Sequence, residues 1–303
     1  MKPCVAILIP TFRRPEGLAK ALRHIAQLQT SADVTIHIAD NEPTGQEGVA
    51  IARRLSEAGY PFRIVTQVVA AKGVSHVRNA LISAALADQG VDFLAFLDDD
   101  EWPEPQWLEA LLDMQRQTGA HAVGGSMSPA FAAAPRWAET LSLYRQENAD
   151  GPIAMLWGTC NLLLTRQCVE MIPAPWFDVQ FGLTGGEDVE FFERAKSLGA
   201  TFAWASRAQV FEDVPASRTT LGWVLRRSFR IGDTNARTQM RWRFGRLGPV
   251  AVFVKAVGRL PFAMFTAIRH CNDTVQLVEA SLQAARSMGE IAALFGLRYR
   301  EYG

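Results

Sequence analysis

The sequence has few of the residues that stabilise small secreted domains or bind structural metals. It contains 4 Cys without a C-x-x-C pair, which argues against a disulfide scaffold or a cysteine-rich zinc site. Its 5 His show no metal-ligand spacing, and the P-loop and G-x-G-x-x-G motifs are missing. Scattered thiols in a chain of 303 residues are typical of a reducing compartment.

The chain also lacks an overall charge, because 31 Lys+Arg balance 31 Asp+Glu. The two parts of the sequence are nevertheless charged oppositely. Residues 1–215 have 17 basic and 26 acidic side chains, a net charge of −9, whereas residues 216–303 have 14 and 5, a net charge of +9. With 49% hydrophobic residues the chain is of globular composition. We therefore expect a globular domain over residues 1–215 and a basic region of different function over residues 216–303.

The first hundred residues alternate apolar runs of strand length with amphipathic stretches. This alternation predicts a parallel sheet with helices on both faces, in which ligands bind at the carboxyl ends of the strands. Asp40 and the acidic run at residues 98–100 follow such strands. The predicted strands are residues 5–9, 34–39, 62–65 and 93–97, and the predicted helices follow Pro15, Val49 and Ser75, with Ser75 as a cap.

The middle of the sequence is less regular. Apolar runs predict strands at residues 121–126 and 161–165, and two short strands at residues 201–205 and 209–212. Between them, a helix is expected over residues 187–198, ended by Gly199.

The acidic run Asp98-Asp99-Asp100-Glu101 directly follows an apolar strand. Carboxylates at a strand end suit a divalent cation shared with a diphosphate, because hard cations take oxygen ligands. Such an ion would also relieve the repulsion between the four acids. The alternative is an acidic turn that is simply solvated.

A second acidic element, Gly185-Gly186-Glu187-Asp188, opens the predicted helix at residue 187. A carboxylate at a helix N-terminus is stabilised by the dipole and by free N–H groups, so a simple cap is one interpretation. The other is a general base on a glycine-lined loop that a substrate approaches closely.

The basic region begins with an arginine-rich segment in which Arg227 and Arg230 are three residues apart and share a helix face. Forked guanidinium donors match phosphate oxygens, so this pair is suited to a diphosphate. For the neighbouring arginines a solvated or lipid-facing basic helix is at least as good an interpretation. A nucleic-acid site is not expected, because the segment adjoins an apolar stretch and no RNA-reading fold.

The apolar stretch spans residues 247–268 and contains only Lys255 and Arg259 as charges. Together with two internal glycines and Pro261, these charges favour a helix that lies in a membrane interface over one that spans it. The alternative is a core helix of a soluble enzyme. An amphipathic helix is expected after it, capped by Asp273 and ended by Gly296.

Six segments in this order, over roughly residues 3–235, resemble the family 2 glycosyltransferases. Within that family the resemblance is to the bacterial group that builds exopolysaccharide repeat units on a lipid carrier, of the succinoglycan glucosyltransferase type. The segments are Ile9-Pro10-Thr11-Phe12, Asp40-Asn41, the G-x-x-x-A-R-N-like stretch from Gly73 to Asn79, the D-x-D element at Asp98-Asp99-Asp100, Gly186-Glu187-Asp188, and Arg227-x-x-Arg230.

The resemblance implies an α/β protein of GT-A fold, with a mixed sheet flanked by helices. The charge division and the apolar stretch place this domain over residues 1–215 and predict a basic, amphipathic, membrane-associating helical extension over residues 216–303. The resemblance also implies transfer from a nucleotide-diphospho-sugar, with UDP favoured, and inversion. Asp188, with Glu187 beside it, is the implied catalytic element, and Asp100 the implied ligand of Mn²⁺ or Mg²⁺. The implied nucleotide-sugar-binding residues are Pro10, Thr11, Arg13, Asp40, Arg78, Asp98, Asp99, Arg227 and Arg230.

The expected partners are a nucleotide-diphospho-sugar donor, a lipid-linked or oligosaccharide acceptor and a membrane surface, with no nucleic acid. The expected location is the cytoplasmic face of the inner membrane, peripheral or in the plane of the bilayer. Two other classes remain open. A nucleotidyltransferase of related fold would need similar acids, although the turn after the first strand lacks its glycines; a non-catalytic membrane-binding protein would have no use for a base.

Overall fold

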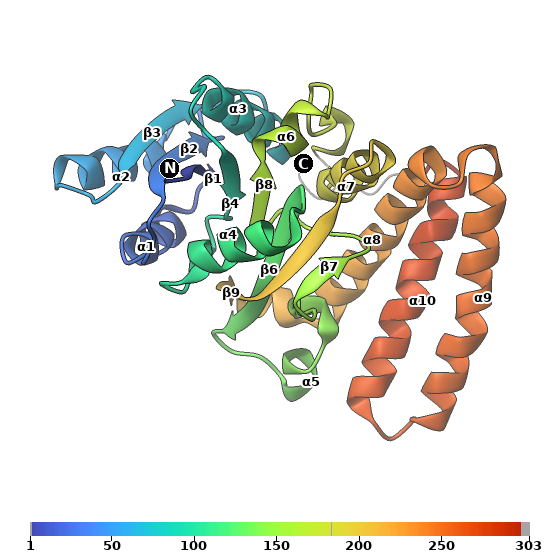
Figure 1. Cartoon of the computed structure of the whole chain (residues 1–303). Coiled ribbons are helices and arrows are strands. Elements are labelled where there is room, and N and C mark those ends of the chain that lie inside the picture. The colour runs from blue at the N-terminus through green and yellow to red at the C-terminus, as the bar shows by residue number, and fades with distance from the viewer. Residues whose placement is uncertain (1, 183, 298–303) are drawn as a thin grey trace.

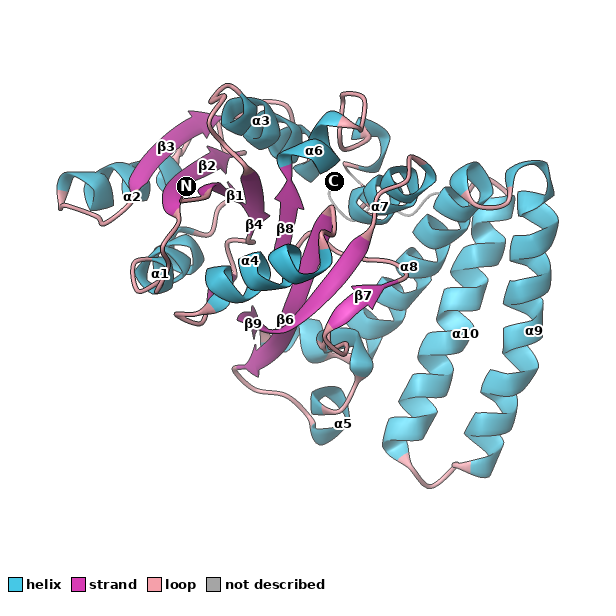
Figure 2. Ribbon diagram, viewed as in Figure 1, coloured by secondary structure: helices cyan, strands magenta, loops and turns pink. Residues whose placement is uncertain are grey.

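The structure is a computed structural model, and it describes residues 2–182 and 184–297. One half of its central sheet is parallel, with strands in the order β3-β2-β1-β4 (Figures 1 and 2). All the strands and helices predicted in the first hundred residues are present. They are β1 (Cys4–Thr11), α1 (Pro15–Ile25), β2 (Asp33–Asp40), α2 (Glu47–Glu57), β3 (Arg63–Val68), α3 (Val74–Leu86) and β4 (Phe93–Phe96).

The parallel sheet predicted for the first hundred residues is therefore confirmed, and the other half of the sheet is mixed, as the family resemblance implied. β4 pairs antiparallel with β8, β8 antiparallel with β6, and β6 parallel with β9. Two short strands, β5 and β7, pair antiparallel with β9. The elements are β5 (Glu101–Pro103), α4 (Trp107–Thr118), β6 (Ala122–Phe131), α5 (Arg136–Glu139), η1 (Ser142–Tyr144), β7 (Gly151–Ile153), β8 (Leu162–Thr165), α6 (Arg166–Glu170), η2 (Val179–Phe181), α7 (Glu187–Ser197) and β9 (Phe202–Val214).

One strand, β9, replaces the two short strands predicted at residues 201–205 and 209–212. Ser206 and Arg207 interrupt the apolar pattern, which is why the sequence suggested a break. Pairing with β6 nevertheless continues through this point, because the register of β6 shifts between Gly125 and Met127. A β-bulge of this kind absorbs the extra residues without ending the strand.

Two apolar clusters cover the two faces of the sheet. In β1, Val5, Ile7 and Ile9 belong to one cluster, with the inner faces of α1 and α4. The alternate residues Ala6 and Leu8 belong to the other, with α3, α6 and α7. This alternation follows from the two-residue period of a strand. A sheet buried on both faces is rigid, and it fixes the positions of the loops at its carboxyl edge.

The start of α3 differs from the prediction, because Gly73 and not Ser75 occupies the N-cap position. Gly73 has a φ of 117°, and a Cβ there would lie 3.0 Å from the carbonyl oxygen of Gly182. Only glycine combines that backbone conformation with such a close approach. Ser75 is buried instead, and its hydroxyl donates to the carbonyl of Asp178 at 3.1 Å. These contacts join α3 to the segment that precedes α7.

The C-terminal region consists of helices that pack beside the sheet domain, with α10 between α8 and α9 (Figure 1). As predicted, Asp273 caps α10 by accepting from the N–H of Val275 at 2.9 Å. The amphipathic helix at the end of the chain is thus confirmed. The elements are η3 (Ala216–Thr219), α8 (Leu221–Trp242), η4 (Gly245–Leu247), α9 (Gly248–Arg269) and α10 (Thr274–Leu294).

Helix α9 is exposed along most of its length. Within the part of the chain that the structure describes, one segment, Gly245–Arg269, is long and apolar enough to cross a membrane, with a mean hydropathy of 1.5 in its most apolar window. Only 17% of that window is buried. The helix therefore does not pack as the core helix of a soluble enzyme would, which was the alternative interpretation of residues 247–268.

Candidate active site

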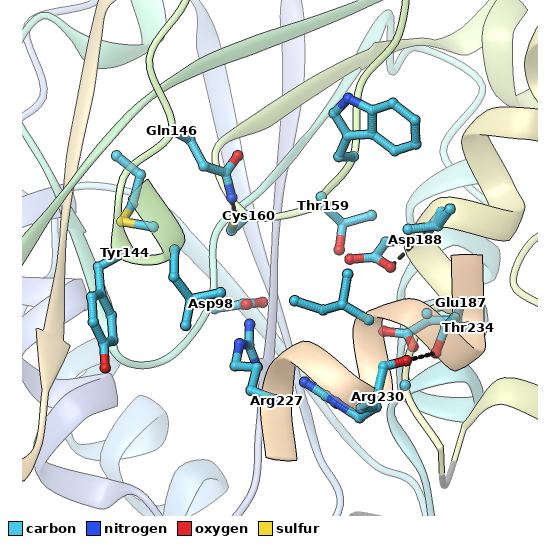
Figure 3. Close-up of a pocket in the computed structure, with 18 of the residues that line it drawn as sticks. Asp98, Tyr144, Gln146, Thr159, Cys160, Glu187, Asp188, Arg227, Arg230 and Thr234 are labelled. Atoms are coloured by element: carbon cyan, nitrogen blue, oxygen red, sulfur yellow. Dashed lines mark hydrogen bonds between the residues drawn. The ribbon is translucent and has the colours of Figure 1, made fainter. Parts of the chain in front are cut away.

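A cleft of about 1660 Å³ opens at the carboxyl ends of β1 and β4. Its walls come from the start of α7, from α8 and from the facing sides of α9 and α10. Figure 3 shows Asp98, Asp188, Arg227 and Arg230 around this cavity, although they come from three separate elements of the chain. The cleft therefore brings together the acidic run, the start of α7 and the arginine pair that the sequence singled out.

Within the acidic run, Asp99 holds the turn after β1. Its carboxylate accepts from the Thr11 hydroxyl at 2.9 Å and from the Phe12 N–H at 3.3 Å. It also pairs with Arg14 at 3.0 Å. Burial raises the pKa of Asp99 to about 6, against the attraction of Arg14. Asp99 thus positions the turn that borders the cleft.

Asp100 and Asp98 pair with different arginines, and the partner of Asp98 is Arg78. Asp100 pairs with Arg14 and with Arg218, whose guanidinium is 3.5 Å from it. Arg218 also pairs with Glu212 at 3.1 Å, so one guanidinium lies between two carboxylates. Burial and the negative charge of Asp98 raise the pKa of Asp100, although Arg14 lowers it. Burial and the charge of Asp100 likewise raise the pKa of Glu212 to about 7.

These carboxylates fit a hard divalent cation by donor type and by charge. All of them offer oxygen, and their mutual repulsion is what a cation would relieve. Among residues 2–182 and 184–297, however, no three His, Cys, Asp or Glu side chains converge into a metal site of their own. Any ion bound near Asp100 therefore needs further oxygen ligands from a substrate or from water.

At the start of α7 the two acids have different surroundings. Glu187 is buried and pairs with Arg78, which also reaches Asp98 at 3.4 Å. Burial raises the pKa of Glu187 to about 7 despite Arg78. Burial would lower the pKa of Arg78, but Asp98 and Glu187 outweigh it and raise that pKa. The Arg78 guanidinium therefore ties the strand-end acids to α7.

Asp188 is half-buried, lines the cleft and accepts from the Val189 N–H at 2.8 Å. Burial raises its pKa, while Arg78, Arg230 and Arg227 lower it. Its second carboxylate oxygen has no hydrogen bond among the described residues. Of the two acids, Asp188 is thus the one placed to meet a molecule in the cleft.

The glycine pair before these acids is explained by the approach of α8. A Cβ on Gly185 would lie 2.5 Å from the Arg230 guanidinium, and one on Gly186 would lie 1.6 Å from the Thr234 methyl group. Both glycines also have positive φ angles of 74° and 90°. The pair therefore allows α8 to bring Arg230 against the start of α7, while Arg227 lines the cleft and packs over the Trp223 ring at 5.4 Å.

Most of the predicted site residues line this cleft, but two do not. Arg13 pairs with Glu42 outside it. Asp40 is buried, and its carboxylate accepts from the N–H groups of Glu42 and Gly48, both at 2.9 Å. Asn41 lines the cleft in its place. The residues that are brought together are Pro10, Thr11, Arg78, Asp98, Asp99, Asp100, Glu187, Asp188, Arg227 and Arg230.

Sequence reasoning missed the partners of the acids, namely Arg14, Arg218 and the role of Glu212. Arg14 lies next to the first motif and Arg218 begins the arginine-rich segment, but neither position predicts pairing with residue 100. The available signal was the acid at residue 212, which is the last residue of the final predicted strand.

Comparisons with known proteins agree on one family. The family model for glycosyl transferase family 2 matches residues 6–166. The succinoglycan biosynthesis protein ExoM of Rhizobium meliloti is 31% identical over 99% of this chain and 96% of its own length. Among solved structures, the mannosyltransferase PcManGT from Pyrobaculum calidifontis in complex with GDP-Man and Mn²⁺ has a TM-score of 0.63, at 14% identity over 98% of this chain and 88% of its own. TarS 1–349 of S. aureus in complex with UDP has a TM-score of 0.54, at 11% identity over 99% and 93% of the two chains.

Proposed function

This chain belongs to glycosyl transferase family 2 and has its GT-A fold, and from that premise we propose that it transfers a sugar, with inversion, from a nucleotide-diphospho-sugar to a lipid-linked or oligosaccharide acceptor. The observation that carries the proposal is that Asp188 faces the same cleft as Asp98 and Arg227. UDP is the nucleotide that the family resemblance favours; TarS was solved with UDP and PcManGT with GDP-Man. ExoM suggests a role in cell-surface polysaccharide biosynthesis.

Inversion is a single displacement, so one base must take the proton of the acceptor hydroxyl while the leaving diphosphate departs from the opposite face of the sugar. Asp188 is suited to act as the base, because one of its carboxylate oxygens accepts no hydrogen bond from the described residues and is open to the cleft. Burial also raises the pKa of this carboxylate, which makes it more basic than an exposed aspartate. Glu187 does not, because it is buried against Arg78. We assign Glu187 to positioning: through Arg78 it fixes the distance between α7 and Asp98.

The leaving diphosphate needs positive charge in preference to an acid. Arg227 and Arg230 on α8 provide guanidinium groups in the cleft wall. Mn²⁺ or Mg²⁺ would be held by Asp100, with Glu212 beside it, and when bound would neutralise charge on the diphosphate. Arg14 and Arg218 pair with Asp100 in this structure, so a metal ion at this carboxylate would have to replace at least one of these guanidinium contacts.

We further propose that the enzyme lies on the cytoplasmic face of the inner membrane through α9. The outer side of this helix exposes Phe253, Val254, Phe265 and Ile268, each at least 49% accessible. A water-exposed apolar face of this length favours burial in a lipid interface, and the basic charge of residues 216–303 favours anionic lipid. Lys255 and Arg259 face Glu290 on α10, so the polar side of α9 is turned inward. That orientation supports an in-plane arrangement.

The test is UDP release by the full-length protein from a panel of UDP-sugars, with Mn²⁺ or Mg²⁺ and a membrane lipid extract as acceptor. We expect release that depends on both the metal and the extract, and its loss in Asp100→Ala. Asp113→Ala removes a carboxylate on the outside of α4 and serves as the matched control. Turnover that persists in excess EDTA would contradict the metal, and no turnover with any nucleotide sugar would contradict the transferase.

A further inference from the structure

The cleft continues beyond the residues assigned to the donor and the base, into the space between α8, α9 and α10. At that end it is lined by Arg243, Lys255, Arg259 and Arg286. The acids there are Glu279, which lines the cleft, Glu290, which is buried, and Glu193 of α7, which is buried near Arg243 and Lys255. Four cations against three anions leave this end with a net positive charge, and no step of the proposed reaction uses it.

The cations are not equally engaged. Glu290 takes up two of them, with Lys255 at 3.2 Å and Arg259 at 3.0 Å from its carboxylate oxygens. Arg286 is half-buried, and no other described side chain lies within hydrogen-bond or ion-pair distance of its guanidinium, so Glu290 and Glu279 attract it only at longer range. Burial and the nearby Arg259 lower its pKa, although the more distant charges of Glu290 and Glu279 act in the opposite direction. A partly desolvated guanidinium without a carboxylate in direct contact costs folding free energy, and an anion bound in the cleft would offset that cost.

The packing of α10 on α8 fixes this guanidinium relative to the donor site. A Cβ on Gly232 of α8 would lie 2.0 Å from the carbonyl oxygen of Arg286. A Cβ on Gly289 of α10 would lie 1.9 Å from the carbonyl oxygen of Phe229. The two backbones are therefore in contact. Arg286 on α10 lies beside Gly232, which is two residues after Arg230 on α8. Its position is set by helix packing and does not depend on a flexible loop.

The same end of the cleft borders an apolar surface. Phe262 lines the cleft and is 61% exposed, and it belongs to the helix whose outer side carries the other exposed aromatic residues. A ligand that satisfies both features has an anionic group for Arg286 and a hydrocarbon chain that leaves along α9. Free nucleotide satisfies only the first, and a neutral lipid satisfies only the second.

We propose that Arg286, with Arg259 beside it, binds the phosphate end of a lipid-linked acceptor, at a site separate from that of the donor diphosphate. The inference rests on the proposed function, since it places the acceptor of that reaction. The lipid chain lies along α9, and the sugar end of the acceptor extends through the cleft toward Asp188. Donor and acceptor thus approach the base from opposite ends of one cleft.

Binding is tested with the full-length protein and phosphatidylcholine vesicles that contain either farnesyl diphosphate or, at matched surface charge, phosphatidylglycerol. The wild type is expected to prefer the diphosphate vesicles. Arg286→Gln should reduce that affinity about tenfold or more, because hydrogen bonds between charged groups are worth that much, and Arg286→Lys should restore part of it. Arg269→Gln is the matched control: it removes an exposed charge from the end of α9 outside the cleft, and should cost at most a few-fold.

Two further readouts separate binding from structure. The melting temperature of Arg286→Gln should equal or exceed that of the wild type, and the KM for a lipid-linked acceptor should rise more than the KM for the donor. Equal affinity of the wild type for both kinds of vesicle, an unchanged preference in Arg286→Gln, or a drop of several degrees in its melting temperature would each overturn the inference. If the wild type turns over no nucleotide sugar, the proposed function fails, and the vesicle result still decides this site.

Discussion

The sheet domain and the C-terminal helices bury their apolar residues very differently. In the sheet domain two clusters fill both faces, and all of the largest fully buried side chains come from residues 7–192. The helices share only small clusters, one of them made of Ala236, Val252 and Ala293. Of the eighteen large apolar side chains exposed among the described residues, nine lie within residues 247–268. The sheet domain buries its large apolar side chains within its own core, whereas the helical region leaves many of its own exposed. We therefore expect an apolar surface to cover these exposed side chains.

Charge divides the two regions in the same way, but the active site needs both. The acids at the strand ends and at the start of α7 belong to the negative region, where Arg14 and Arg78 pair with them, whereas Arg227 and Arg230 on the opposite wall of the cleft belong to α8. The boundary at residue 215, expected from charge alone, therefore runs through the cleft. Substitutions in the sheet domain should affect catalysis, and substitutions in the C-terminal helices should affect membrane binding. Substitutions in the cleft, where the two regions meet, can affect both.

The largest effect is expected from Asp188→Asn, which removes the proposed base while keeping the shape of the side chain. A general base contributes about 10²–10⁴ in rate, so turnover should fall by that factor while UDP affinity stays. Steady-state kinetics and UDP titration measure the two. A parallel fall in UDP binding would make Asp188 a binding residue. Membrane association should not change, which tests the division between the regions.

The next effect concerns the pH dependence of the sheet domain. Because the pKa of Glu187 is raised from 4.5 to about 7, the folded protein holds a proton that the unfolded chain loses between these values. Stability should therefore fall as pH rises from about 4.5 to 7, by about 3 kcal/mol for this group. In Glu187→Gln this part of the dependence should disappear, as measured by urea unfolding at pH 5 and pH 8. An unchanged slope in the variant would place the titration elsewhere.

The contact between α8 and α10 is tested by Gly289→Ala. The added methyl group would meet the Phe229 carbonyl at 1.9 Å, so the helices must separate. Overpacking of this kind costs about 1–3 kcal/mol, and the melting temperature should drop by several degrees. Gly258→Ala is the control, since a Cβ there meets nothing within 4 Å. Equal melting temperatures for the two variants would show that the close contact is not maintained.

The smallest effect is expected from exposed residues of α9. Replacing Phe253, Phe265 and Ile268 by Ser removes apolar surface that the folded protein leaves exposed. Co-sedimentation with vesicles should weaken about tenfold, with little change in melting temperature. Leu198→Ser, another exposed apolar residue but in the sheet domain, should change neither. If the α9 variant sediments like the wild type, the membrane face lies elsewhere.

The sequence alone was sufficient to predict the helices and strands in which apolar residues recur at regular spacing. Leu18, Leu22 and Ile25 recur at helical spacing, and the alternate residues of β1 face opposite clusters, so helix and strand could be recognised without partners. The acids at the strand ends could be recognised because strand ends share an edge. The arginine pair and the Glu187-Asp188 element were recognised by family resemblance and by helix spacing.

Only the tertiary structure decided which charged side chains form ion pairs and which do not. Arg78 with Glu187, Arg218 with Asp100 and Lys255 with Glu290 are contacts between residues far apart in sequence, which no local pattern encodes. Glu187 and Asp188 are adjacent in sequence, yet burial turns one toward Arg78 and leaves the other at the cleft. Likewise, nothing local distinguishes Arg286 from the other arginines of the basic region. Two glycines let its helix touch α8, and Glu290 is already in direct contact with Lys255 and Arg259, so Arg286 has no carboxylate in direct contact among the described residues.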